Sequence, residues 1–145
     1  MKKVIMTLVI AVSSIAAFAN EGDVNQTVLN SFNKEFTGAK EVTWTANTGY
    51  YHAAFVFNQQ YISAFYNIDG SLMALTRNIS SLDLPLILQT KLRNNYSGYW
   101  ISALTEVSKE EGTSYYVTLE NSDSKITMKS SGNRRWTTVK KTIKA

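Results

Sequence analysis

The sequence predicts an α+β domain in which single helices alternate with runs of antiparallel strands. Twice along the chain, apolar residues spaced by three and four give way to apolar residues that alternate with polar ones. Turn residues such as Asn, Asp, Ser and Gly separate the alternating stretches at short intervals. Because no helix separates the strands within each run, this order favours antiparallel sheet over a parallel α/β arrangement.

The first twenty residues precede this pattern and have the three parts of a secretory signal peptide. Lys2 and Lys3 form a positive n-region, residues 4–15 form an apolar h-region, and Ala17-Phe18-Ala19 is an A-x-A cleavage site. The apolar run is short for a span of the bilayer, and it ends in small residues instead of a charged flank. We therefore expect a signal peptide over residues 1–19 rather than a membrane anchor or a buried helix.

Cleavage after Ala19 would leave one domain, residues 20–145, which we expect to be soluble and either periplasmic or secreted. No cysteine stands at the cleavage point to accept a lipid, so we expect no stable membrane insertion. Loss of Lys2 and Lys3 lowers the formal charge from +4 to +2, because the signal contains no acidic residue. So small an excess gives no indication of nucleic-acid binding. The absence of cysteine excludes thiol catalysis, Fe–S clusters and cysteine-based zinc sites.

The first half of the domain begins with an amphipathic helix over about Val24 to Phe36, with Asp23 as a candidate cap. Its apolar residues follow helical spacing: Val24, Val28, Leu29, Phe32 and Phe36. Alternation then predicts four strands, and Asp69-Gly70 is a strong hairpin signal because glycine tolerates a positive φ. The predicted strands cover residues 42–46, 50–58, 61–67 and 72–78.

The second half repeats this order. A helix opens at Leu84-Pro85 and continues to about Tyr96, where Ser97-Gly98 ends it. The strands that follow are predicted over residues 100–109, 114–120, 125–130 and 134–143. The halves agree at the helix ends, along one strand and at one hairpin. These agreements predict a duplicated unit, residues 23–79 and 80–145, although chance similarity of two α+β halves is an alternative.

At these residues the chain resembles the PepSY-like proteins exported by Bacteroidetes-type bacteria, whose fold is similar to that of β-lactamase-inhibitor protein. The matching pieces in the first half are Phe32…Phe36, Val42-x-Trp44, Tyr51-x-Ala53-x-Phe55 and Tyr66…Asp69-Gly70. Those in the second half are Leu84-Pro85, Tyr96-x-Gly98-Tyr99 and Tyr115-x-Val117-x-Leu119. The resemblance implies a helix and a four-stranded sheet used twice. Relatives of this fold are associated with inhibition of a peptidase or another hydrolase, and the resemblance makes such a target one option for this chain.

The sequence lacks the residue clusters of common active sites. His52 is the only histidine, and no acidic residue stands near it in sequence to build a triad. The acids lie mostly at predicted caps, turns and strand ends, and no calcium loop or phosphate-binding glycine loop is present. We therefore expect no enzyme activity, no catalytic residues, no metal site and no cofactor.

Strand alternation predicts that one face of the sheet is left open, because the helices cover a single side. Its expected side chains are those of a protein-binding surface, where aromatic rings dominate the energetics. They are Tyr50, His52, Tyr61, Phe65, Tyr116 and Trp136. The alternative is that these residues pair across strands or pack inside the molecule. The interpretation is an exported binding module for another envelope or secreted protein; a carrier of small apolar ligands and a structural envelope protein are the alternatives.

Overall fold

The computed structural model describes residues 18, 19, 21–132 and 134–145. The n-region and h-region of the expected signal peptide lie outside this range. Within the range, none of the helices has the length and apolar character needed to cross a membrane.

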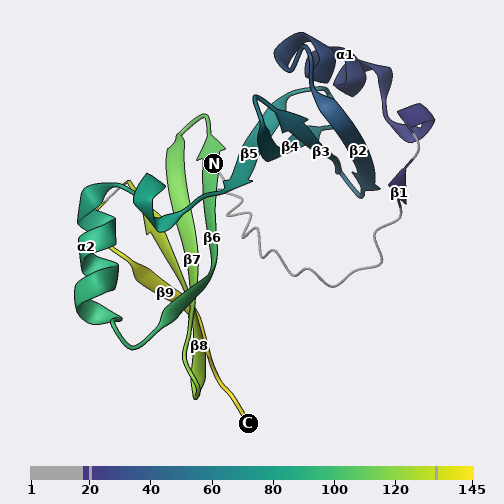
Figure 1. Ribbon diagram of the computed structural model, residues 1–145. Coiled ribbons are helices and arrows are strands. Elements are labelled where there is room, and N and C mark those ends of the chain that lie inside the picture. Colours follow the sequence, from purple (N-terminus) through teal and green to yellow (C-terminus); the bar gives the residue numbers. More distant parts are fainter. Residues whose placement is uncertain (1–17, 20, 133) are drawn as a thin grey trace, which may run out of the picture.

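The described residues form one antiparallel sheet of nine strands, ordered as a meander from β1 to β9, and two α-helices (Figure 1). The predicted α+β class is therefore confirmed. The strands are β1 (Phe18–Ala19), β2 (Lys40–Asn47), β3 (Tyr50–Phe57), β4 (Gln60–Asn67), β5 (Leu72–Asn78), β6 (Trp100–Lys109), β7 (Gly112–Glu120), β8 (Ser124–Ser131) and β9 (Thr137–Ile143).

The helices are α1 (Gln26–Glu35) and α2 (Leu86–Asn95), and a short 3-10 turn precedes each. The helix α1 is capped by Asn25, whose side chain accepts a hydrogen bond from the Thr27 amide at 2.8 Å. The expectation that Asp23 is the cap was wrong, because Asp23 lies in the preceding 3-10 turn. A capping box between Ser80 and Asp83 organises the turn before α2.

Each helix packs on its own part of the sheet, so the molecule has two lobes in Figure 1. The first lobe contains α1 with β2–β5 and the second contains α2 with β6–β9. The hairpin between β4 and β5 turns at Gly70, where φ is +87° and a Cβ atom would come within 2.9 Å of Thr27 on α1. Glycine is therefore required there both by backbone conformation and by the close approach of the helix.

Both helices cover the same face of the continuous sheet. Leu75 packs against the first core and pairs with Ser108, while Arg77 on the same side pairs with Glu106. Glu106 shares its face with Leu104, which belongs to the second core. The two lobes meet at this seam, where Arg77 forms an ion pair with Glu106 at 2.9 Å.

Candidate binding face

The sheet surface opposite the helices is the candidate functional site, and we call it the open face. In the first lobe the strand registers place these residues on it: Lys40, Thr43, Thr45, Tyr50, His52, Ala54, Val56, Tyr61, Ser63, Phe65, Ala74 and Thr76. In the second lobe they place these residues on it: Trp100, Thr105, Val107, Lys109, Ser114, Tyr116, Thr118, Glu120, Lys125, Thr127, Lys129, Lys140 and Thr142.

The expected aromatic residues of the first lobe are brought together here. Phe65 lies between two of them, with its ring centroid 4.7 Å from His52 and 6.2 Å from Tyr50. Tyr61 extends into solvent and is 78% exposed. A hollow of about 140 Å³ is lined by residues from both sides of the sheet, with Tyr61 from the open face and Arg77 from the helix side among them. The open face itself therefore combines a stack of rings with one projecting ring.

His52 is held in the stack rather than prepared for acid–base chemistry. Its ring is nearly parallel to Phe65, with an interplanar angle of 13°, and its Nε2 is buried without a hydrogen-bond partner among the described residues. Burial lowers the pKa of the His52 imidazole because it disfavours the charged form. Its neighbours across the strands are Thr45 and Phe65, neither of which could orient the imidazole as an acid does in a triad.

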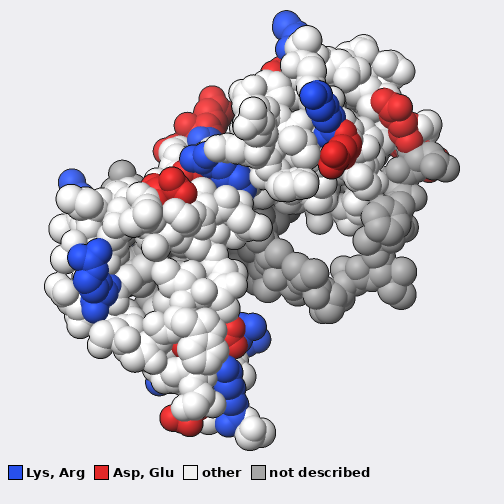
Figure 2. All heavy atoms as spheres, in the orientation of Figure 1, with Lys and Arg blue, Asp and Glu red and all other residues white. Residues whose placement is uncertain are grey.

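The second lobe contributes positive charge to the open face. Tyr116 lies there as expected, with the Lys129 ammonium 5.4 Å from its ring centroid. The lysines of this part of the face are Lys109, Lys125, Lys129 and Lys140, and none of them forms an ion pair within the described residues. In contrast, the first-lobe members of the open face include one charged residue, Lys40, which pairs with Val56. Figure 2 shows that charged atoms are sparse over much of the visible surface.

Trp136 does not lie on the open face, so its inclusion with the aromatic set was wrong. Its ring packs against the second core, and its Nε1 donates a hydrogen bond to the Leu88 carbonyl of α2 at 3.2 Å. The strand β9 begins only at Thr137, so strand alternation does not apply to Trp136.

Two apolar residues in the middle of the open face are buried. Ala74 and Val107 are 5% and 4% exposed although no helix covers them. Phe65 lies directly opposite Ala74, and Thr76 and Ser114 lie opposite Val107. A partner would therefore meet most of the aromatic rings on the first lobe and most of the lysines on the second.

Several acidic side chains have structural partners. Asp69 accepts hydrogen bonds from Ser71 in the β4–β5 turn, Asp83 completes the capping box, and Glu106 pairs with Arg77. These hydrogen bonds, from Ser71 and from Ser80 respectively, lower the pKa of the Asp69 and Asp83 carboxyls. No group of three or more metal-ligating side chains occurs in the part of the chain that the structure describes.

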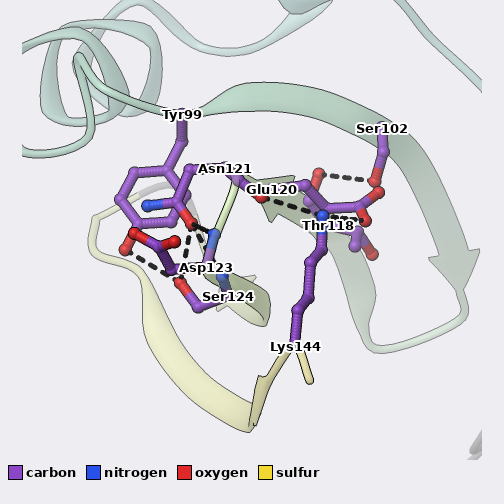
Figure 3. A network of polar contacts seen from close by, with 8 residues as sticks. All are labelled: Tyr99, Ser102, Thr118, Glu120, Asn121, Asp123, Ser124 and Lys144. Carbon is purple, nitrogen blue, oxygen red and sulfur yellow. Dashed lines mark hydrogen bonds and ion pairs between the residues drawn. The ribbon is translucent and has the colours of Figure 1, made fainter.

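A polar network at the tip of the second lobe was missed by the sequence analysis (Figure 3). The Asn121 side chain accepts hydrogen bonds from the amides of Asp123 and Ser124, at 2.9 and 2.7 Å. Lys144 donates to the Asn121 carbonyl at 2.8 Å and forms an ion pair with Glu120 at 3.2 Å. The network fastens the end of the chain to the β7–β8 turn. The Asn-Ser-Asp-Ser run was an available signal for this turn.

No family model and no curated protein matches this chain. Solved structures do share its fold. A DUF2874 family protein from Bacteroides ovatus superposes with a TM-score of 0.73 at 18% identity, covering 83% of this chain and 87% of the other. A BLIP-like protein from Bacteroides fragilis superposes with a TM-score of 0.68 at 17% identity, and the match covers 80% of this chain and 86% of the other. A protein from Bacteroides eggerthii, provisionally described as periplasmic, superposes with a TM-score of 0.72 at 14% identity, and the match covers 83% of this chain and 88% of the other. The resemblance to BLIP-like proteins of Bacteroidetes-type bacteria is therefore confirmed for the fold.

Proposed function

We propose that this chain is an exported, non-enzymatic module that binds a peptidase or another hydrolase of the cell envelope through its open face. The observation that carries the proposal is that one helix-free sheet surface gathers Tyr50, His52, Phe65 and Tyr61. Aromatic rings bury large areas while losing few torsional freedoms, so a cluster of them is an efficient anchor for a protein partner. The likeness in fold to a protein described as periplasmic and to a BLIP-like protein supports this setting.

The lysines of the second lobe suggest the kind of surface that the partner presents. Lys125, Lys129 and Lys140 would face acidic side chains on the partner, while the rings of the first lobe would enter an apolar depression. Such complementarity steers association and fixes the orientation of the complex, and the apolar contacts slow its dissociation.

The experiment is capture of envelope proteins on the immobilised protein, followed by activity assays of what is captured. We expect a hydrolase that binds in a one-to-one ratio and loses activity when bound. The combined variant Tyr50→Ala, Tyr61→Ala, Phe65→Ala should keep the fold, because these residues lie outside both cores, but should no longer bind the hydrolase.

The matched control replaces exposed residues on the helix-covered side, Gln26→Ala, Asn30→Ala and Thr90→Ala, and should bind like the unmodified protein. Equal binding by the aromatic variant would contradict the proposed face. Unfolding of that variant, seen as loss of the cooperative urea transition, would instead assign the rings to the core.

A further inference from the structure

A second recess lies on the other side of the sheet, under the C-terminal end of α2. It has a volume of about 340 Å³, within the range of small-molecule sites. Its walls come from α2, the 3-10 turn at residues 81–83, the segment 96–99 that follows α2, and the strands β6 and β7. The apolar residues among them are Leu82, Leu92, Tyr96, Tyr99, Ile101 and Leu119. We call this space the α2 pocket.

The α2 pocket lies where the second lobe has leucines in place of two phenylalanines of the first. In the first lobe, Phe55 contacts Phe32 and Phe36 at centroid distances of 4.9 and 4.8 Å, and Phe57 contacts Phe36 at 5.5 Å. The equivalent residues, by position in the helix and by strand register, are Leu92 for Phe32, Tyr96 for Phe36, Leu119 for Phe55 and Asn121 for Phe57. Leu92 and Leu119, which line the pocket, are smaller than Phe32 and Phe55 and therefore leave space, while Tyr96 keeps a ring at its position.

One charged group borders the pocket. Arg93 is the only lysine, arginine or acid among its lining residues, and it makes no ion pair within the described part of the chain. The other long polar side chain, Gln89, is already engaged: its amide donates to the carbonyls of Leu82 and Leu84 at 3.2 and 2.8 Å. Gln89 therefore fixes the wall of the pocket, and Arg93 remains available to an anion.

We propose that the α2 pocket binds a medium-chain carboxylate, with its alkyl chain against Leu92, Ile101 and Leu119 and its carboxylate paired with Arg93. At about 30 Å³ per water-sized group, the volume holds roughly ten such groups, which corresponds to a chain of about eight to ten carbons. The guanidinium group can hold a carboxylate through two parallel hydrogen bonds. This site is independent of the open face, which lies on the opposite side of the sheet.

The probe is sodium decanoate, titrated below its micelle concentration into the ¹⁵N-labelled protein, with decanol as the uncharged comparison. We expect saturable amide shifts around residues 82, 93, 96–101 and 119, and a dissociation constant of roughly 10 µM to 1 mM. Arg93→Gln should weaken decanoate binding about five- to tenfold and leave decanol binding unchanged. Lys34→Gln, which removes the basic residue from the last turn of α1, is the matched control and should change neither.

Variants that fill the pocket with a larger side chain provide a second test of the proposal. Leu119→Phe restores a ring present in the first lobe and should abolish binding of both probes. Because Leu119 is 2% exposed and the larger ring could disturb the core, Ile101→Trp, at a site that is 39% exposed, provides a second block. The proposal is overturned if shifts are scattered or map to the open face, if Arg93→Gln binds decanoate normally, or if a folded blocking variant still binds.

Discussion

The two lobes of this protein use one backbone plan with different side chains. In the first core, the Phe32 ring lies 4.9 to 6.5 Å from the rings of Phe36, Trp44, Phe55 and Tyr66. The second core is mainly aliphatic, with Leu88, Leu92, Leu104, Val117, Leu119, Ile126 and Met128 at its buried positions. The comparison teaches that helix length, strand alternation and turn placement determine the shared architecture. The identity of the core side chains then determines whether a lobe is filled or keeps a pocket.

The same contrast extends to the open face. Its first-lobe part is mainly aromatic, with Lys40 as its one charged residue, whereas its second-lobe part combines Tyr116 with four lysines. Apolar rings mainly govern how long a complex lasts, and exposed charges mainly govern how fast it forms. The two lobes are thus expected to contribute differently to a single binding event.

The largest difference between the lobes should appear on truncation of the cores. Phe32→Ala removes a ring that is 3% exposed and contacts four others, and we expect a loss of about 4 kcal/mol in the free energy of unfolding. Leu92→Ala, at the equivalent helix position, should cost only about 2.5 kcal/mol, near the low end for such a truncation, because the residue already borders the α2 pocket. Urea unfolding of both variants measures the difference. Equal losses would contradict the tighter packing of the first core.

Binding kinetics should separate the two parts of the open face. With a captured hydrolase as ligand, the combined variant Lys125→Gln, Lys129→Gln, Lys140→Gln should lower the association rate about tenfold at low salt and reduce its salt dependence. Phe65→Ala should instead raise the dissociation rate. Lys141 pairs with Ile126 and faces the helix side, so Lys141→Gln is the matched control for Lys140. If Lys141→Gln slowed association as much, net charge rather than the face would be responsible.

The two lobes also differ in whether the buried hydroxyl group at one equivalent position forms a hydrogen bond. Tyr66 pairs with Tyr51, and Ser130 pairs in the same register with Tyr115. The Tyr66 hydroxyl donates to Glu35 on α1 at 3.0 Å, whereas the Ser130 hydroxyl is buried without a partner among the described residues. We expect Tyr66→Phe to destabilise the protein by about 1 kcal/mol. Ser130→Ala should be neutral or slightly stabilising, since it removes an unsatisfied polar group. Thermal unfolding of the two variants tests the sign of each change.

Much of the fold could be predicted because local signals agreed with it. The strands β5 and β6 begin and end at the predicted residues, since turn residues flank both of them. Alternation also placed Tyr50, His52, Tyr61, Phe65 and Tyr116 on one face, as the registers do. Strand ends and side-chain alternation depend only on residues that are close in sequence, so they could be predicted without knowledge of the fold.

The features that escaped prediction depend on contacts between distant residues. Trp136 follows a turn, so its direction is decided by the Leu88 carbonyl on α2 and not by strand phase. The network around Asn121 needs Lys144 from the far end of the chain. The bulge in β2, where Glu41 has a φ of 53°, shifts the register between Lys40 and Thr43 without any turn signal. The α2 pocket likewise depends on how α2 packs against β6 and β7, whose residues are distant from it in sequence.

The smallest expected effect is a dependence of stability on pH that belongs to the first lobe alone. His52 is the only histidine, and burial holds its pKa below the ordinary value of 6.5. The unfolded chain therefore binds a proton more readily than the folded protein as the pH falls through 6.5, and the free energy of unfolding decreases below that pH. The carboxyls with lowered pKa, Asp69, Asp83 and Glu120, lose their stabilising charge only at more acidic pH. Urea unfolding at pH 7.5 and pH 5.5 should show this decrease in the unmodified protein and not in His52→Phe, whose ring can keep the stack on Phe65. A decrease that persists in His52→Phe would mean that another group titrates, and the histidine would then be a passive member of the aromatic cluster.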